Sequence, residues 1–114
     1  MRIISQDGKV DLPYELTKLQ IEARPKVLGG TESIFRIQGY FVSNTDWELL
    51  AEYSTNKKAE KALWMLRDKY STLRVQEVID KDVNVMVLET HSQEQMEEYF
   101  TASFQFPTDD EVEV

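Results

Sequence analysis

Residues 52–70 of this 114-residue chain read EYSTNKKAEKALWMLRDKY, and this stretch decides the fold class. Its apolar side chains recur three and four residues apart, at Ala59, Ala62, Leu63, Leu66 and Tyr70. At about 100° per residue these positions share one side of a helix, as in a surface helix packed on a core. Ser54 precedes them and can cap the first turn. The spacing therefore predicts one long amphipathic helix from about Thr55 to Ser71.

The segments around this helix follow the two-residue alternation of β-strands. The strongest short-range signal is Asp7-Gly8, which lies between two apolar runs and predicts a hairpin with a two-residue type I′ turn. In that hairpin Ile3 faces Leu12, and Pro13, which lacks an N–H, ends the second strand. Alternation predicts further strands at 16–24, 33–42, 46–54, 74–79, 83–89 and 101–107.

Two of these strands carry more detailed expectations. In the stretch 33–42, Gly39 lies among the apolar positions and indicates either a bulge or a close approach by another segment. In the stretch 46–54, strict alternation places four residues on one face, namely Trp47, Leu49, Ala51 and Tyr53. Residues 92–100 are expected to form one or two helical turns, capped by Ser92.

Together these elements predict an α+β fold. We expect a mainly antiparallel sheet of five to seven strands, packed against the one long amphipathic helix. The chain length suits a single core, and no repeat or linker marks a second one, so residues 1–107 are expected to form a single α+β domain. Residues 108–114 read TDDEVEV and are expected to form an acidic, frayed C-terminal tail.

The net charge of −8 is distributed unevenly. Residues 1–74 carry 12 basic and 10 acidic side chains, whereas residues 75–114 carry one lysine and 11 acids. Because nucleic-acid affinity rests on neutralising phosphates, this balance disfavours direct binding of nucleic acid. The acidic third serves either for solubility or as a surface that meets a basic partner or mimics nucleic acid.

Other function classes are limited by composition. The chain has no cysteine, which excludes disulfides, thiol catalysis and zinc–thiolate sites. No apolar run approaches the roughly 18 residues of a membrane span, and the N-terminus does not have the pattern of a signal peptide. We therefore expect a cytoplasmic protein that does not enter a membrane.

One stretch has part of a calcium-loop pattern. In DKDVNV, Asp80, Asp82 and Asn84 occupy loop positions 1, 3 and 5. The pattern then fails, because position 6 is Val85 where glycine is required and position 12 is His91 where a bidentate Glu should stand. A turn between two strands explains these residues better, so no metal site is expected.

Catalytic and cofactor motifs are missing from the sequence. His91 is the only histidine, and neither it nor the adjacent Ser92 lies in a nucleophile motif. Gly29-Gly30 lacks the pattern of a phosphate-binding loop, and the adjacent Glu97-Glu98 define no general-acid geometry. We therefore expect a protein that is not an enzyme and that has no cofactor.

Trp64 is the residue that stands apart. On the helical wheel it lies about 140° from the core stripe, among polar neighbours that include Lys57, Lys61 and Asp68. Three interpretations remain open: a later segment such as the tail or QMEEYF buries the indole, the indole anchors a partner or a second copy, or it is exposed without a role. These four residues form the candidate partner-binding surface. The basic residues around them could also bind the acidic tail of the same or another copy.

Three stretches, in order along the chain, read MRIISQDG…DLPYE, AEYST..KA.KA..ML and FQFP.DDEVEV, within residues 1–15, 51–67 and 104–114. Together they cover more than a third of the chain. They resemble a family of small proteins of unknown function that are encoded by phages, prophages and other mobile elements of Firmicutes. Relatives of this kind tend to carry Glu at the positions of Lys57 and Trp64. The resemblance implies a mobile-element origin and transfers no catalytic residue.

The expected function is that of a non-enzymatic accessory protein, acting by binding an unidentified host or phage protein. Two alternatives remain open. One is a self-assembling structural component, a homodimer formed through the helix face or an exposed strand edge. The other is the acidic nucleic-acid mimic, motivated by the acids of the last third.

Overall fold

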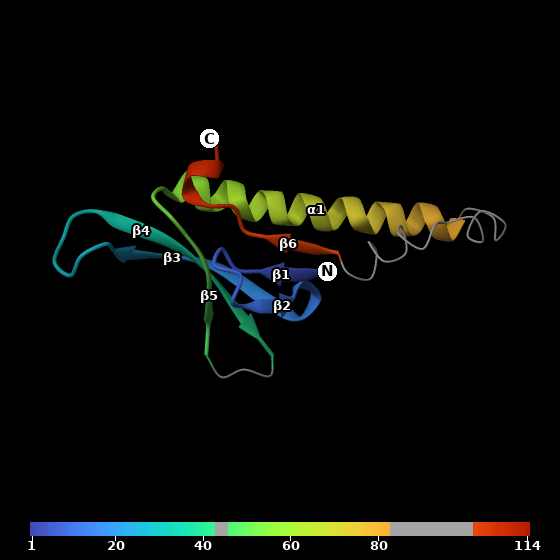
Figure 1. Cartoon of the computed structure of the whole chain (residues 1–114), viewed down its shortest axis with the longest axis horizontal. Helices are drawn as coiled ribbons and strands as arrows, with labels where there is room; N and C mark the ends of the chain where they lie inside the picture. Colours follow the sequence, from blue (N-terminus) through green and yellow to red (C-terminus); the bar gives the residue numbers. More distant parts are fainter. Residues whose placement is uncertain (43–45, 83–101) are drawn as a thin grey trace.

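The computed structural model describes residues 1–42, 46–82 and 102–114, of which 75–82 are described by their backbone alone. Within these ranges the chain is α+β, with six strands and one α-helix. The strands form two three-stranded sheets, ordered β2-β1-β6 and β3-β4-β5, and α1 lies along both (Figure 1). The expected single sheet of five to seven strands is therefore wrong in its arrangement, since strands from the two ends of the chain form a sheet of their own.

This terminal sheet joins β1 (Arg2–Ile4), β2 (Asp11–Pro13) and β6 (Ser103–Gln105). The β1–β2 pair is antiparallel with Ile3 opposite Leu12, which confirms the expected register and the strand end at Pro13. The β1–β6 pair is parallel, with Ile3 beside Phe104. Ile3 in the central strand is fully buried. Its apolar neighbours on both sides explain why residues so distant in sequence pair here.

The turn between β1 and β2 differs from the expected type I′. The N–H of Gly8 donates to the Ser5 carbonyl at 3.0 Å. Gly8 has a φ of 75°, and no non-glycine residue in the described ranges has a positive φ. A type I′ turn needs positive φ at two residues. Here Asp7 keeps a negative φ, because its carboxylate accepts hydrogen bonds from the Ser5 hydroxyl at 2.6 Å and from the Lys9 N–H at 3.0 Å.

The larger sheet joins β3 (Thr17–Pro25), β4 (Ser33–Phe41) and β5 (Glu48–Tyr53), all antiparallel. β5 pairs with β4 only from Phe35 onward. The last residues of β3 and the first residues of β4 therefore extend past β5 as a two-stranded arm (Figure 1). Gly29, with a φ of 81°, turns the chain at the tip of the arm. The expected alternation of β3 is confirmed at Leu19 and Ile21, which pack against the core.

A β-bulge at Leu50 changes which face of β5 is buried. Ile37 pairs with Ala51 and Gln38 with Leu49, so Leu50 is the extra residue between the two pairs. Leu50, Ala51 and Tyr53 are buried, whereas Trp47 and Leu49 are exposed. The expectation that Trp47, Leu49, Ala51 and Tyr53 share one face is therefore wrong, because one inserted residue reverses the alternation before it.

Gly39 is a point of close approach, as one of its two interpretations predicted. A Cβ at this position would lie 2.9 Å from Leu50 Cδ1, 3.0 Å from Thr17 Cγ2 and 3.1 Å from Leu12 Cδ1. Distances this short leave no room for a side chain. The bulge itself is on β5, opposite the glycine strand, and it directs Leu50 into the space that Gly39 leaves free.

The helix α1 (Asn56–Asp82) starts one residue later than expected and ends eleven residues later. Its cap is Thr55, whose hydroxyl accepts the Lys58 N–H at 3.1 Å, and not Ser54. The predicted strand at 74–79 is helical, and no Gly or Pro in 56–82 interrupts the turns. The predicted stripe is buried at four positions: Ala59, Ala62, Leu63 and Leu66. The two alanines allow the helix to approach the β3-β4-β5 sheet closely.

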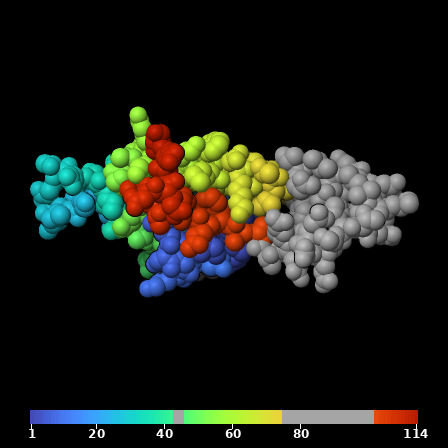
Figure 2. All heavy atoms as spheres, turned by 45° about the horizontal axis from the view of Figure 1, so that its top comes forward, coloured from blue at the N-terminus to red at the C-terminus, as the bar shows by residue number. Residues whose placement is uncertain are grey.

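The C-terminal residues are packed against the rest of the chain over 108–112. A short 3₁₀ helix, η2 (Asp109–Glu111), follows β6, and Val112 after it is buried at 3% exposure. Figure 2 shows this segment (red) lying across the start of α1 (green) and beside the N-terminal strands (blue). The expectation of a frayed tail is therefore wrong for these five residues. The strand predicted at 83–89 and the helical turns at 92–100 lie outside the described residues.

Candidate functional site

The four residues expected to bind a partner occupy one side of α1. Lys57, Lys61, Trp64 and Asp68 are spaced four, three and four residues apart, so they form a single stripe. All four are exposed, and the buried stripe that begins at Ala59 lies on the opposite side. We call this stripe the outer helix face.

Trp64 is the only large apolar side chain of this face, and 56% of it is exposed. The ammonium of Lys61, one turn earlier, lies 4.5 Å from the centre of the indole ring. This cation–π contact keeps the ring against the helix and leaves one of its faces to solvent. The interpretation in which the C-terminal tail buries Trp64 is wrong, because the tail packs at Lys58 instead. The segment QMEEYF lies outside the described residues.

The charges of the outer helix face are mixed. Among the ion pairs of the described residues, none includes Lys57, Lys61 or Asp68. Glu60, beside the face, accepts a hydrogen bond from the Asn56 amide at 2.9 Å. The face therefore offers an aromatic ring between a basic end and an acidic end, the composition of an interface anchor.

Two other lysines of α1 bind within the chain. Lys58 Nζ lies 3.2 Å from Asp109 Oδ2 and donates to the Asp109 carbonyl at 2.9 Å. Lys69 Nζ donates to the Ser103 carbonyl. The expected contact between basic helix residues and the acidic tail therefore exists, within one copy. It occupies Lys58, while Lys69 bonds to Ser103 in β6, outside the tail, and neither contact involves the outer helix face.

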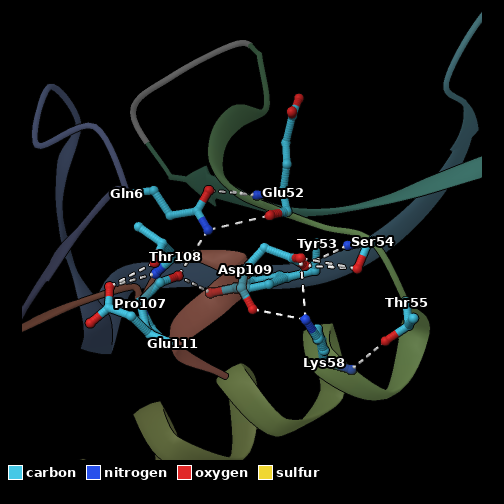
Figure 3. A network of polar contacts seen from close by, with 10 residues as sticks. All are labelled: Gln6, Glu52, Tyr53, Ser54, Thr55, Lys58, Pro107, Thr108, Asp109 and Glu111. Atoms are coloured by element: carbon cyan, nitrogen blue, oxygen red, sulfur yellow. Dashed lines mark hydrogen bonds and ion pairs between the residues drawn. The ribbon is translucent and has the colours of Figure 1, made fainter. Parts of the chain in front are cut away.

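Polar contacts connect this tail to β5 and to the first hairpin (Figure 3). The Gln6 amide donates to the Pro107 carbonyl at 2.8 Å and to the Glu52 carbonyl at 3.3 Å, and it accepts the Glu52 N–H at 2.8 Å. The Tyr53 hydroxyl donates to the same Pro107 carbonyl at 2.7 Å. We call these contacts, with those of Asp109 below, the C-terminal network.

Asp109 is the charged member of the C-terminal network. Its carboxylate accepts the Ser54 N–H at 2.7 Å and the Ser54 hydroxyl at 3.0 Å, and it pairs with Lys58. The bond from the Ser54 backbone is the largest cause that holds the pKa of Asp109 below its ordinary value, and the Ser54 hydroxyl and Lys58 add to it. Burial raises the pKa of the nearby Tyr53 phenol, so this hydroxyl remains a neutral donor.

A groove of about 760 Å³ opens between the C-terminal network and the arm. It is lined by Lys26 and Glu32 from the arm tip, by Phe35 and Tyr53 from the sheet, and by Asp109. Its polar groups are already bonded within the C-terminal network on one side. Among residues 1–42, 46–82 and 102–114, no three His, Asp or Glu side chains gather where a metal ion could bind.

The residues of the discarded calcium pattern are placed only in part. Asp80 and Asp82 belong to α1, so they are helical and do not form the turn that was expected for them. Asn84, Val85 and His91 lie outside the described residues.

Reasoning from sequence missed the C-terminal network. Gln6 and Asp109 lie in the stretches that carry the family resemblance, but nothing in those stretches indicates a polar contact, and their partners are 46 to 101 residues away in sequence. The one available signal was FQFPTDDE, in which an apolar strand is followed by Pro and then by Thr108, whose hydroxyl and N–H both bond to Glu111. That pattern marks a capped turn and argues against a frayed tail.

A second exposed tryptophan, Trp47, was also missed. Its ring lies against the half-buried Tyr40, with the two ring centres 5.3 Å apart. In the part of the chain that the structure describes, no helix is long and apolar enough to cross a membrane.

Comparisons with protein-family models, with curated proteins and with solved structures give no match to this chain.

Proposed function

We propose that this chain is a non-enzymatic accessory protein of a phage or other mobile element, which acts in the host cytoplasm by binding a host or phage protein. The observation that carries the proposal is the exposure of Trp64 on a regular helix, with the Lys61 ammonium against its ring. Tryptophan is enriched among the residues that contribute most to protein interfaces. A rigid helix presents it with little loss of side-chain freedom on binding.

Three further observations support this assignment. The sequence resembles small mobile-element proteins in three ordered stretches. Its single histidine and its serines form no recognisable catalytic pattern. Two acids of the last third, Asp109 and Glu111, are bonded within the chain, which leaves fewer charges for the alternative role as a nucleic-acid mimic.

The test is capture of proteins from a Firmicute lysate by the tagged chain, run beside Trp64→Glu. We expect the wild type to retain a partner that Trp64→Glu loses. Trp47→Glu is the matched control, because it places the same charge at the other exposed tryptophan and should retain the partner. Circular dichroism checks that both variants fold. Equal retention by wild type and Trp64→Glu would contradict the proposal.

A direct readout follows from the presence of only two tryptophans. In a Trp47→Phe background, Trp64 is the only tryptophan of the chain, and excitation at the red edge of the absorption band selects it over the tyrosines. Binding of the captured partner should shift its emission to shorter wavelength as the ring leaves water. An unchanged emission with a saturating amount of partner would place the interface elsewhere on the molecule.

A further inference from the structure

The two edges of the β3-β4-β5 sheet differ in whether their outward backbone groups are hydrogen-bonded within the chain. At the β5 edge, the Gln6 N–H donates to the Leu50 carbonyl at 2.9 Å, and the Gln6 side chain bonds to both backbone groups of Glu52. The next outward group, the Ser54 N–H, donates to Asp109. This edge is therefore closed to any further strand by the chain itself.

The β3 edge is open along most of its length. Among the described residues, nothing outside β4 hydrogen-bonds to the backbone of residues 18–25. The strand is nine residues long and regular, with its register to β4 unbroken from Thr17 to Pro25. An unpaired edge of this kind is a template for a strand from another chain.

The sequence of β3 is complementary to itself. Lys18, Gln20 and Glu22 point away from α1, whereas Leu19 and Ile21 point towards it and are half-buried. If two copies pair antiparallel with Gln20 opposite Gln20, Lys18 of each copy lies opposite Glu22 of the other. Leu19 then lies opposite Ile21, also twice. Both faces of the junction are thereby matched.

Other registers are worse. With Ile21 at the centre, Lys18 faces Arg24, and with Leu19 at the centre no opposite charges meet. With Ala23 at the centre, Glu22 faces Arg24, but only residues 21–25 overlap, and they include Pro25, which has no N–H to donate. The ion pair that Glu22 makes with Arg24 at 2.7 Å does not exclude Lys18, because a carboxylate accepts several hydrogen bonds.

We infer that β3 is a dimerisation edge, at which two copies of this chain join their sheets into one antiparallel six-stranded sheet centred on Gln20. The occupant is a second copy because both the charges and the apolar residues match when the strand meets itself in this register. This interface lies on a sheet edge and does not include the outer helix face. The dimer and the proposed partner can therefore succeed or fail separately.

Charge reversal tests the register. Sedimentation equilibrium over a concentration series should show a monomer–dimer equilibrium for the wild type. In Lys18→Glu, the new glutamate of each copy lies opposite Glu22 of the other copy. In Glu22→Lys, the new lysine of each copy lies opposite Lys18 of the other. Each variant should therefore raise the dimer Kd by about tenfold or more. An equimolar mixture of the two variants should dimerise again, because every like-charge pair becomes an opposite-charge pair. That rescue also shows that both variants are folded.

A cross-link tests the centre of the interface. The chain has no cysteine, so Gln20→Cys introduces a single thiol that meets its own copy at the dyad. Mild oxidation should link this variant into covalent dimers, while Lys18→Cys, whose thiols lie about four residues apart across the junction, should link far less. A wild type that stays monomeric throughout, or a dimer that survives both charge reversals and links equally at both positions, would overturn the inference.

Discussion

Gln6 connects three segments that are distant in sequence. Its backbone and side chain together bond to Leu50 and Glu52 of β5 and to Pro107 of the C-terminal segment, which connects both to the first hairpin. No other side chain among the described residues bonds to both the β5 edge and Pro107 in this way. A single amide thus positions the terminal sheet against the larger one.

We expect Gln6→Ala to lower the free energy of unfolding by about 1 to 3 kcal/mol, because a backbone donor and two acceptors lose a partner. Urea denaturation measures this value. The matched control is Gln105→Ala, whose amide makes only two longer bonds, at 3.3 and 3.4 Å. A smaller effect for Gln6 than for Gln105 would show that water replaces the lost contacts in full.

Gly39→Ala should also destabilise the fold, by about 1 to 3 kcal/mol, because the new methyl group overlaps three neighbouring side chains. The nearest is Leu50, which the bulge directs towards the glycine. Combining Gly39→Ala with Leu50→Ala should cost less than the two separate changes added together. Denaturation of all four species of this double-mutant cycle measures the coupling, and simple additivity would contradict the contact.

At the scale of elements, local pattern predicted some features well and others poorly. The register of Ile3 with Leu12, the alternation of β3 and the strand around Phe104 were predicted because each depends on neighbours in the sequence. The bulge at Leu50 was not, because it depends on Gly39 from another strand. The extension of α1 was missed because alternation predicted a strand at 74–79, although local pattern is a weak guide once a helix is already in progress.

The C-terminal network has a consequence for the pH dependence of stability. The pKa of Asp109 is lower in the folded chain than in the unfolded one, so its ionised form favours folding. This contribution to the free energy of unfolding is complete above the ordinary aspartate pKa of about 4. It is lost as the pH falls through the lower pKa that Asp109 has in the folded chain. Asp109→Asn should therefore lose less stability than the wild type between neutral pH and strong acid.

Urea denaturation at several pH values measures this difference. Asp110→Asn is the matched control, because Asp110 is exposed and the neighbouring substitution removes the same charge. Its loss of stability in acid should follow that of the wild type. Parallel curves for all three chains would contradict a role for Asp109 in attaching the C-terminal segment.

At the scale of the whole molecule, the two ends of the chain complete one core. Phe104, Phe106 and Val112 are buried together with Ile3 and Leu12. Their parallel pairing could not be predicted, because nothing in either segment indicates a partner about 100 residues away. For the candidate site the balance is similar. The helical wheel predicted that Trp64 points away from the core. The contact between Gln6 and the segment that contains Asp109 depends on the tertiary fold, so no local pattern predicted it.

Truncation tests this shared core. A chain that ends at residue 102 lacks β6 and the buried side chains after it, and we expect it to lose cooperative unfolding. A chain that ends at Val112 lacks only two exposed residues, Glu113 and Val114, and should melt within a few degrees of the wild type. Thermal denaturation followed by circular dichroism compares them. Cooperative melting of the shorter chain would show that β6 is dispensable.

The parallel pairing of β1 with β6 also sets an order in time. A ribosome adds about 5 to 20 residues per second, so the first strand waits on the order of 5 to 20 seconds before its last neighbour exists. During that interval Ile3 has Leu12 on one side and no strand on the other. The terminal sheet is therefore completed only after residue 105 has been made, and until then the chain depends on how well this one apolar strand is protected.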